Sequence, residues 1–116
     1  MLVKEEDQFK NKAINFAKQN LDYDMIKNDH ESVFNRDAWL KCGQYGLQGS
    51  LIPKRYGGQE LSALNTVHSM QGFGYACLDD GLLFGISAHL FACAIPILNF
   101  GTDAQKDLKP AGAKPI

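Results

Sequence analysis

The chain of 116 residues is long enough for one domain with its own hydrophobic core and too short for two. Hydrophobic residues make up 45% and charged residues 22%, an ordinary globular balance that excludes a disordered chain. The formal net charge is −1 and no basic stripe is present to neutralise phosphates, so we expect no nucleic-acid partner.

The N-terminal segment predicts an amphipathic helix over residues 4–20. An apolar stripe recurs along it at helical spacing, with acidic residues in the first turn and lysines later, as the helix dipole prefers. The members of this stripe are Phe9, Ala13, Phe16 and Ala17. Acidic residues also stand where a secretory signal would need positive charge and an apolar run, so we expect a cytoplasmic protein.

A second helix is predicted to begin after Asn35, a residue type that caps helix N-termini, and to end between Gly43 and Gly46. The residues expected to face the core from it are Ala38, Trp39 and Cys42. Residues 22–34, which precede this helix, show no sustained period and are predicted to be a connection.

The stretch IPKRYGG at residues 52–58 predicts a turn, because Pro53 fixes one backbone angle and two glycines follow. A loop around Tyr56 that binds a ligand is the alternative. Neither a GxGxxG nor a GxxxxGK pattern surrounds Gly57 and Gly58, so this pair is not a phosphate cradle. We expect the turn to have a structural role.

A third helix is predicted to open with Ser62 as its N-cap and to turn one apolar face toward the core. The residues of this face are Ala63, Val67, Met70, Gly74 and Cys77. Asp79 and Asp80 come next. Adjacent carboxylates at a helix start are expected to cap the helix, and an acid/base pair is the alternative.

The stretch from Gly81 to Phe100 is nearly as long as a membrane span. It contains several polar residues, acidic residues flank it, and no Lys or Arg stands directly at either end to set a topology. We therefore expect no membrane span, but a helix over residues 81–95 that other helices or another domain bury on nearly every side. Pro96 should kink or end this helix, because proline lacks an N–H group.

Thr102 and Gln105 fit a capping box, so a fifth helix is predicted to begin there. Residues 109–116 hold two prolines and a glycine and are predicted to be a frayed tail after a domain of residues 1–108. Strand signals are limited to a few residues around 47–53. The predicted fold is all-α, an up-and-down bundle of four to five helices.

Cys42, Cys77 and Cys93 lack the spacing of a metal knuckle or a redox pair, so we expect buried thiols in a reducing compartment. His68 and His89 stand singly, without carboxylates or cysteines at ligand spacing. We expect both to be hydrogen-bonded helix residues, and we assign no metal site.

Four motifs in a fixed order make the chain similar to a known family. These motifs are FNRDAW at 34–39, YGLQGSLIPKRYGG at 45–58, DD at 79–80 and PILNFGTDAQK at 96–106. Each motif is loose by itself, but their order over about residues 5–108 resembles the N-terminal α-helical domain of the acyl-CoA dehydrogenase family.

The resemblance implies a flavoenzyme of three domains, which are this helical domain, a β-domain and a second helical domain. Members of the family bind FAD and remove a proton from Cα and a hydride from Cβ of an acyl thioester. In them the flavin is held mainly by the β-domain and the C-terminal helices, and the catalytic carboxylate lies in the C-terminal part. We therefore assign no catalytic and no cofactor-binding residue to this chain and expect it to be inactive without the missing domains or a partner subunit.

By similarity, the helix over residues 81–95 forms one wall of the acyl pocket. The distance of each position to Pro96 assigns four residues to the substrate side. These residues are Phe84, Gly85, Ala88 and Ala92. Three of them are small residues in an otherwise bulky helix and leave room for a ligand. Close helix packing at the small residues is the alternative.

Two functions remain open from the sequence. The first is the N-terminal domain of an acyl-CoA dehydrogenase-like flavoenzyme, present as a truncated chain or as one piece of a split enzyme. The second is a stand-alone helical module that binds a partner protein or a lipid chain through its apolar helix, and a membrane-associated helix hairpin ranks last. An apolar helix without cover also predicts self-association, so we expect a homo-oligomer.

Overall fold

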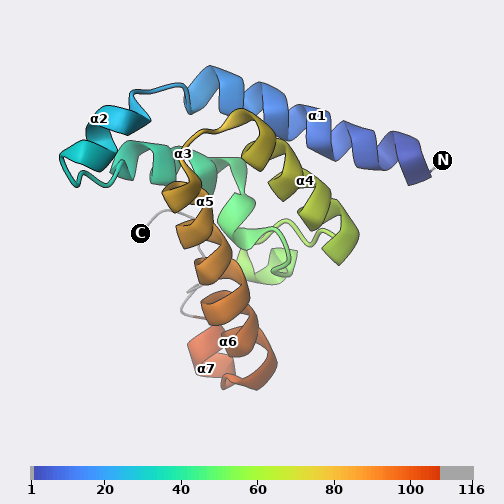
Figure 1. Ribbon diagram of the computed structural model, residues 1–116. Coiled ribbons are helices and arrows are strands. Elements are labelled where there is room, and N and C mark those ends of the chain that lie inside the picture. The colour runs from blue at the N-terminus through green and yellow to red at the C-terminus, as the bar shows by residue number, and fades with distance from the viewer. Residues whose placement is uncertain (1, 108–116) are drawn as a thin grey trace.

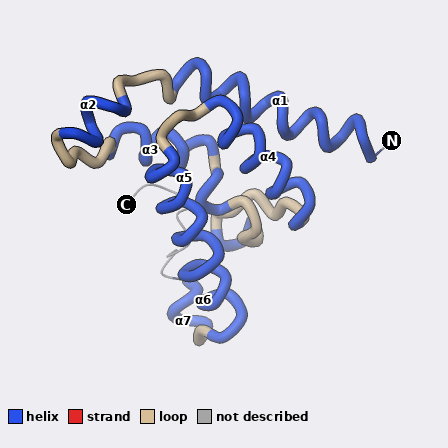
Figure 2. Tube along the Cα trace, in the orientation of Figure 1, coloured by secondary structure: helices blue, strands red, loops and turns tan. Residues whose placement is uncertain are grey.

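The computed structural model describes residues 2–107, with side chains from residue 7 onward. Every regular element in this part of the chain is helical, and it contains no strand (Figure 2). The predicted all-α class is therefore confirmed. The predicted tail at residues 109–116 lies outside the described residues, and so does the domain boundary at residue 108.

The molecule is flat, with extents of 42 × 40 × 18 Å. Helices α1 (Leu2–Asn20) and α4 (Ala63–Ala76) lie side by side (Figure 1). A continuous helical rod leads away from them and consists of α5 (Asp80–Ser87), the π-helical segment η3 (Ala88–Ala94) and α6 (Ile95–Phe100). This rod carries all four predicted pocket residues.

Helix α3 (Arg36–Tyr45) begins and ends as predicted. The side chain of Asn35 accepts a hydrogen bond from the backbone N–H of Ala38 at 2.9 Å and satisfies a donor that has no partner within the helix. Gly46 ends the helix with a φ of 99°, a left-handed conformation that costs glycine little. The 3₁₀ turn η1 (Leu47–Gly49) follows at once.

A short helix, α2 (Met25–His30), lies within residues 22–34, so the prediction of a connection is wrong there. The carboxylate of Asp24 caps its N-terminus. At the other end Ser32 has a φ of 56°, and the chain closes a Schellman-type turn onto the carbonyl of Asn28. A helix of 6 residues that its two caps define is too short to show an apolar period.

The turn at residues 52–58 has the structural role that we expected. It contains the 3₁₀ turn η2 (Lys54–Tyr56), which Gly57 ends with a φ of 88°. Gly58 lies so close to Ile52 that a Cβ at this position would be 2.1 Å from the carbonyl oxygen of Ile52. The backbone itself therefore requires glycine at residue 58, and the turn is a tight chain reversal between α3 and α4.

Helices α1 and α4 approach each other closely through small residues. A Cβ on Gly72 would lie 2.3 Å from the carbonyl oxygen of Lys10 and 2.9 Å from the Cβ of Ala13. Ala13 and Ala17 are completely buried, as predicted for the apolar stripe of the first helix. Only small side chains fit between two backbones at this separation.

The apolar face predicted for α4 is wrong in part. Cys77 is buried and Met70 packs against the core, but Val67 is 56% exposed, and Ala63 and Gly74 lie at the surface. The residues that α4 buries instead are Thr66, Ser69, Gly72 and Phe73. Because α1 approaches this face closely, three of these four positions hold small residues. The hydroxyl of Thr66 donates to the carbonyl of Ser62 at 3.0 Å, so its burial leaves no unpaired donor.

The rod does not end at Pro96, so a helix end at this residue, one of the two effects predicted for the proline, is wrong. Proline lacks the N–H that would bond to the carbonyl of Ala92, and its ring crowds that carbonyl. The π-helical segment η3 lies directly before α6, and its N–H groups bond to carbonyls five residues earlier. The wider turn relieves the crowding, and the helix therefore continues to Phe100.

Helix α7 (Asp103–Asp107) begins with the predicted capping box. The N–H of Thr102 donates to Oε1 of Gln105 at 2.8 Å, and the N–H of Gln105 donates to Oγ1 of Thr102 at 3.2 Å. The predicted bundle of four to five helices thus consists of α1, α3, α4, the rod and α7. Among the α-helices of residues 2–107, the short helix α2 is the one that the sequence did not predict.

The main core lies where α1, α3, α4 and α5 meet. Its buried residues are Ala13, Ala17, Leu21, Ala38, Cys42, Leu47, Phe73, Cys77, Leu82 and Ile86. A smaller cluster of Ile52, Leu90 and Ala94 joins the turn at residues 52–58 to the middle of the rod. These two clusters fix one side of the rod and leave its other side free.

Replacement of Gly72 by alanine should destabilise the fold by about 1–3 kcal/mol, because the new methyl group would collide with the backbone of α1. Gly74, in the same helix, is the matched control, since a Cβ there would meet only Leu83 at 3.9 Å. Gly74→Ala should be neutral or stabilising by up to about 1 kcal/mol. Urea unfolding measures both variants, and equal effects would contradict the close packing of α1 on α4.

Candidate functional site

The rod keeps one row of side chains on its core side along most of its length. The members of this row are Leu82, Ile86, Leu90 and Ala94, and none is more than 2% exposed. In a regular α-helix such a row drifts by about 40° per step, since four residues exceed one turn of 3.6. The π-helical segment holds more residues per turn and offsets this drift. The same geometry keeps an opposite row aligned on the outer face.

Three of the four predicted pocket residues share this outer face. Phe84 is 77% exposed, Ala92 is exposed and Ala88 is half-buried. Gly85 is turned toward α3, where a Cβ would lie 3.5 Å from Cζ3 of Trp39. The structure therefore brings Phe84, Ala88 and Ala92 together on an open face, which we call the outer face of the rod. That distance is an ordinary van der Waals contact, so the packing of the rod on α3 does not require glycine at residue 85.

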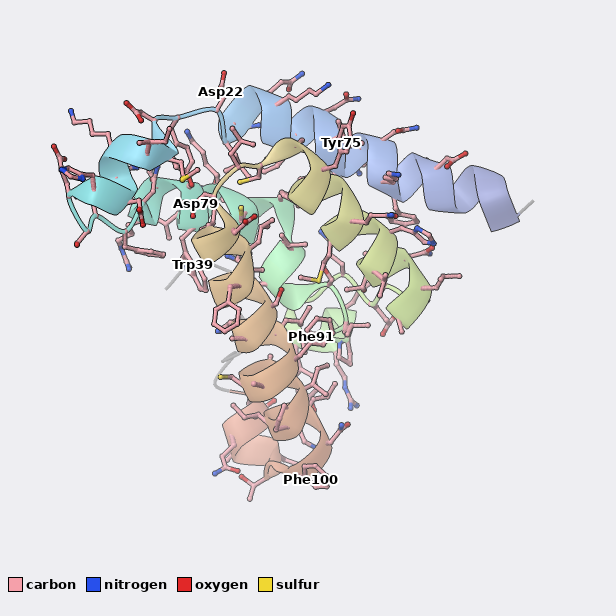
Figure 3. All side chains as sticks on the ribbon, in the orientation of Figure 1. Asp22, Trp39, Tyr75, Asp79, Phe91 and Phe100 are labelled. Atoms are coloured by element: carbon pink, nitrogen blue, oxygen red, sulfur yellow. The ribbon has the colours of Figure 1, made fainter. Side chains whose placement is uncertain are left out.

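An aromatic cluster borders the outer face. The ring of Trp39 meets His89 edge-on at 5.8 Å and Phe34 at 5.9 Å between centroids. Figure 3 shows Trp39 beside the upper part of the rod. Nε2 of His89 is buried and has no hydrogen-bond partner among the described residues, so the expectation of a hydrogen bond is wrong for this atom. The contact of Trp39 with the rod was not predicted, because no pattern in the sequence around Trp39 indicates a contact with residues so far away in the chain.

Asp79 holds the corner between α4 and the rod (Figure 3). One carboxylate oxygen accepts a hydrogen bond from the hydroxyl of Tyr23 at 2.6 Å, and the other accepts from the N–H of Leu82 at 3.0 Å. Burial, and then this hydrogen bond, raise the pKa of Tyr23 above its ordinary value. Asp79 caps α5 as predicted, and Asp80 lies in the first turn of that helix. Both oxygens of Asp79 are engaged, so we interpret this carboxylate as structural.

Two of the three thiols are buried as predicted, but Cys93 is exposed, so the prediction is wrong for it. Burial, and then the nearby Cys77, raise the pKa of Cys42 from 9.0 to about 12. Burial is also the first cause of the raised pKa of Cys77. Cys93 lies on the part of the rod that the chain leaves uncovered. In residues 2–107 no three His, Cys, Asp or Glu side chains gather where they could hold a metal ion.

The chain's own side chains occupy the N-termini of α2, α3, α4, α5 and α7. The capping residues are Asp24, Asn35, Ser62, Asp79 and Thr102. They accept hydrogen bonds from the backbone N–H groups that a phosphate would need, and the two acidic caps would repel an anion. These helix ends therefore do not fit the diphosphate of FAD.

The described part of the chain contains one helix that is long and apolar enough to cross a membrane, the rod from Asp80 to Phe100, with a mean hydropathy of 2.0. Core helices of soluble proteins share this length and composition, so neither property argues for a membrane. Within this chain only 22% of the apolar window is buried, so the expected burial on nearly every side would require cover from another domain. Phe91 and Phe100 are 45% and 88% exposed (Figure 3).

A protein-family model matches almost the whole chain. Its description is acyl-CoA dehydrogenase, N-terminal domain, and it covers residues 3–109. Among curated proteins, the L-prolyl-[peptidyl-carrier protein] dehydrogenase of Pseudomonas fluorescens is 46% identical over 84 residues, which are 72% of this chain and 22% of that protein. The acryloyl-CoA reductase (NADH) of Anaerotignum propionicum is 32% identical over 106 residues, 91% of this chain and 26% of that protein.

Solved structures show the same fold. The prolyl acyl carrier protein oxidase AnaB superposes with a TM-score of 0.87 and 51% identity, over 93% of this chain and 30% of that one. PigA with FAD and proline superposes with a TM-score of 0.84 and 31% identity, over 93% of this chain and 29% of that one. The chain thus spans less than a third of each of these relatives.

Cys93 should be the one thiol of the folded protein that reacts quickly with a chromogenic aromatic disulfide at about pH 8, because Cys42 and Cys77 are buried and protonated. Absorbance should report one thiol per folded chain and three after unfolding. The Cys93→Ser variant should lose the fast phase and keep the other two thiols. A fast phase that persists in this variant would contradict the assignment.

Stability should fall as the solution becomes alkaline. The unfolded chain releases the Cys42 proton near the ordinary pKa of 9.0, whereas the folded chain keeps it until about pH 12. Between these values the unfolded state binds fewer protons, so the free energy of unfolding decreases with pH, while below pH 9.0 this contribution is fully present. The raised pKa values of Tyr23 and Tyr45 extend the loss to higher pH. Urea unfolding at about pH 7.5 and about pH 10.5 measures the change, and a rise would refute it.

Proposed function

Because the chain belongs to the acyl-CoA dehydrogenase family and matches its N-terminal domain over residues 3–109, we propose that it supplies one wall of the acyl pocket in an FAD-dependent oxidoreductase. The proposed reaction is the α,β-dehydrogenation of an acyl thioester. This chain would bind and orient the acyl group against the outer face of the rod. A stand-alone helical module is not favoured, since the family match accounts for nearly the whole chain.

The observation that carries this proposal is the outer face itself. Phe84 exposes 77% of its surface, which is unfavourable for a large apolar side chain in water. Ala88 and Ala92 on the same face are small and leave room beside the ring. An apolar group held between this face and a second wall would remove that surface from water. Substrate binding by Phe84, Gly85, Ala88 and Ala92 is part of this proposal.

A prolyl thioester on a carrier protein is the substrate class that we favour. The relative named L-prolyl-[peptidyl-carrier protein] dehydrogenase is 46% identical to this chain, against 32% for the acryloyl-CoA reductase. AnaB is named a prolyl acyl carrier protein oxidase, and PigA was solved with FAD and proline. The support lies in this agreement between sequence identity and structural likeness.

FAD is the cofactor of the complete enzyme in this proposal and would supply the hydride acceptor. The N-termini of α2, α3, α4, α5 and α7 do not fit its diphosphate. The flavin and the catalytic carboxylate would therefore come from the β-domain and the second helical domain, whichever chain carries them. Those domains would also cover the outer face of the rod in a helical domain spanning residues 1–108. We further propose a homo-oligomeric, cytoplasmic enzyme.

A chimera tests the proposal directly. This chain would replace the matching N-terminal segment of the 46% identical Pseudomonas fluorescens enzyme, and flavin reduction by prolyl-carrier protein would be followed. The chimera should bind FAD and turn over. The Ala92→Phe variant should lower kcat/KM at least tenfold, because the larger ring fills the space of the acyl group, while FAD content stays unchanged.

Cys93→Phe is the matched control for this variant. Cys93 is also exposed and lies next to Ala92, but outside the row formed by Phe84, Ala88 and Ala92. It should leave kcat/KM within about twofold of the parent chimera. If Ala92→Phe and Cys93→Phe have the same effect, the outer face is not the acyl wall. A chimera that binds FAD but oxidises no acyl thioester would refute the proposed function as a whole.

A further inference from the structure

A second open surface lies at the corner of the molecule, away from the middle of the rod. A hollow of about 590 Å³ separates the turn after α2 from the start of α5. A neighbouring hollow of about 270 Å³ shares Met25, Leu78 and Asp79 with it and continues toward the end of α1. We call the two connected hollows together the corner groove. Figure 1 shows α2, α3 and the start of α5 around this corner.

Large apolar side chains stand exposed along the corner groove. Val33 is 50% exposed, Phe34 is 59% exposed and Leu78 is 76% exposed, and all three line the larger hollow. Ile26, on α2, is 76% exposed as well. Exposed apolar residues gathered around a groove are typical of an interaction surface, whereas single ones are common on any protein.

Packing within the chain does not account for helix α2. It has 6 residues, none of them buried, and is too short to be stable by itself. Its two ends are nevertheless fixed, by the Asp24 cap and by Ser32 in a left-handed conformation that a non-glycine residue adopts at some cost. This turn is what holds Val33 and Phe34 at the edge of the groove.

The charges along the larger hollow have one sign. Asp29, Asp79 and Asp80 line it, and no Lys, Arg or His is among its lining residues. Asp29 and Asp80 are exposed, whereas both oxygens of Asp79 are already hydrogen-bonded. The smaller hollow adds Asp22 and Lys18, which balance each other. An occupant of the corner groove would therefore combine apolar side chains with positive charge.

We propose that the corner groove is the docking site for an amphipathic, basic segment of a partner protein. Its apolar side chains would pack against Phe34, Val33 and Leu78, and its Lys or Arg side chains would lie near Asp29 and Asp80. Two connected hollows with exposed apolar side chains suit a helical segment with anchors on one face. This proposal does not rest on the acyl-pocket function, because the groove and the outer face have no lining residue in common.

Two designed peptides test the proposal. The basic probe is acetyl-LKKLLKLLKKLLKL-amide, and the acidic probe has Glu in place of every Lys. The chain has one tryptophan, Trp39, whose ring contacts Phe34, so its fluorescence reports binding without a label. The basic peptide should change the Trp39 emission in a saturable way and should bind at least tenfold more tightly than the acidic one. Added salt should weaken it, since the charges are exposed.

Variants locate the binding. Phe34→Ser and Leu78→Ser should each weaken the basic peptide at least tenfold by calorimetry, and the double variant Asp29→Asn/Asp80→Asn should remove most of the salt dependence. Phe100→Ser and Asp103→Asn, at the far end of the rod, are the matched controls and should bind like the parent chain. Circular dichroism confirms that each variant is folded, which their exposed positions favour.

Several results would overturn the proposal. These are absence of binding at millimolar basic peptide, equal binding of both peptides, or equal weakening by Phe100→Ser and Phe34→Ser. Backbone amide shifts that cluster around Phe84 and Phe91 would instead place the peptide on the rod and would also refute the corner groove. The chimera experiment is independent of each of these outcomes, so failure of one proposal leaves the other standing.

Discussion

The two oxygens of Asp79 hold the corner on which the rest of the structure depends. One of them ties the connection after α1 through Tyr23, 56 residues earlier in the chain, and the other caps the first turn of α5. Asp79, together with the two buried clusters along the rod, therefore fixes the direction in which the rod leaves the pair α1 and α4. The positions of both proposed surfaces depend on this corner, because Asp79 lines the corner groove and the outer face begins about one helical turn after it. A carboxylate with both oxygens paired, one of them to a partly buried tyrosine, gives a rigid corner at little cost in unsatisfied polar groups.

A small domain cannot bury all of its apolar surface, and in this chain the exposed apolar surface lies mainly along the rod and around the corner groove. Close contact of α1 with α4 through Gly72 and Ala13 uses little side-chain volume. The core side of the rod is sealed by the two buried clusters, while its outer face and its last turn remain open. The π-helical segment matters here, since it keeps Phe84, Ala88 and Ala92 in one row in spite of Pro96. The rod is thus buried on one side, and its exposed side can serve as a wall for an apolar ligand.

The helices themselves could be predicted from local sequence, and their burial could not. Asn35, Ser62 and the pair Thr102 and Gln105 mark helix starts because each bonds to a backbone group three residues away. The apolar period of α4 did not predict which side of this helix is buried. The period marks apolar residues, whereas the buried side holds mostly small residues because α1 lies close to it. Helix α2 was missed because its caps, and no apolar stripe, define it. The pocket residues came from family resemblance, and their periodicity alone did not distinguish a ligand wall from close packing.

The sequence by itself determined the family, the all-α class, the helix ends and the turn at residues 52–58, because caps, glycines and prolines act on the backbone within a few residues. Only the tertiary structure decided which of these helices meet and what they leave open. The contact of Trp39 with His89, the bond from Tyr23 to Asp79 and the exposure of Cys93 depend on segments that are far apart in the chain. A linear pattern records the preference of each residue for burial or exposure. Whether that preference is met depends on how closely another helix approaches, and this distance has no local signal.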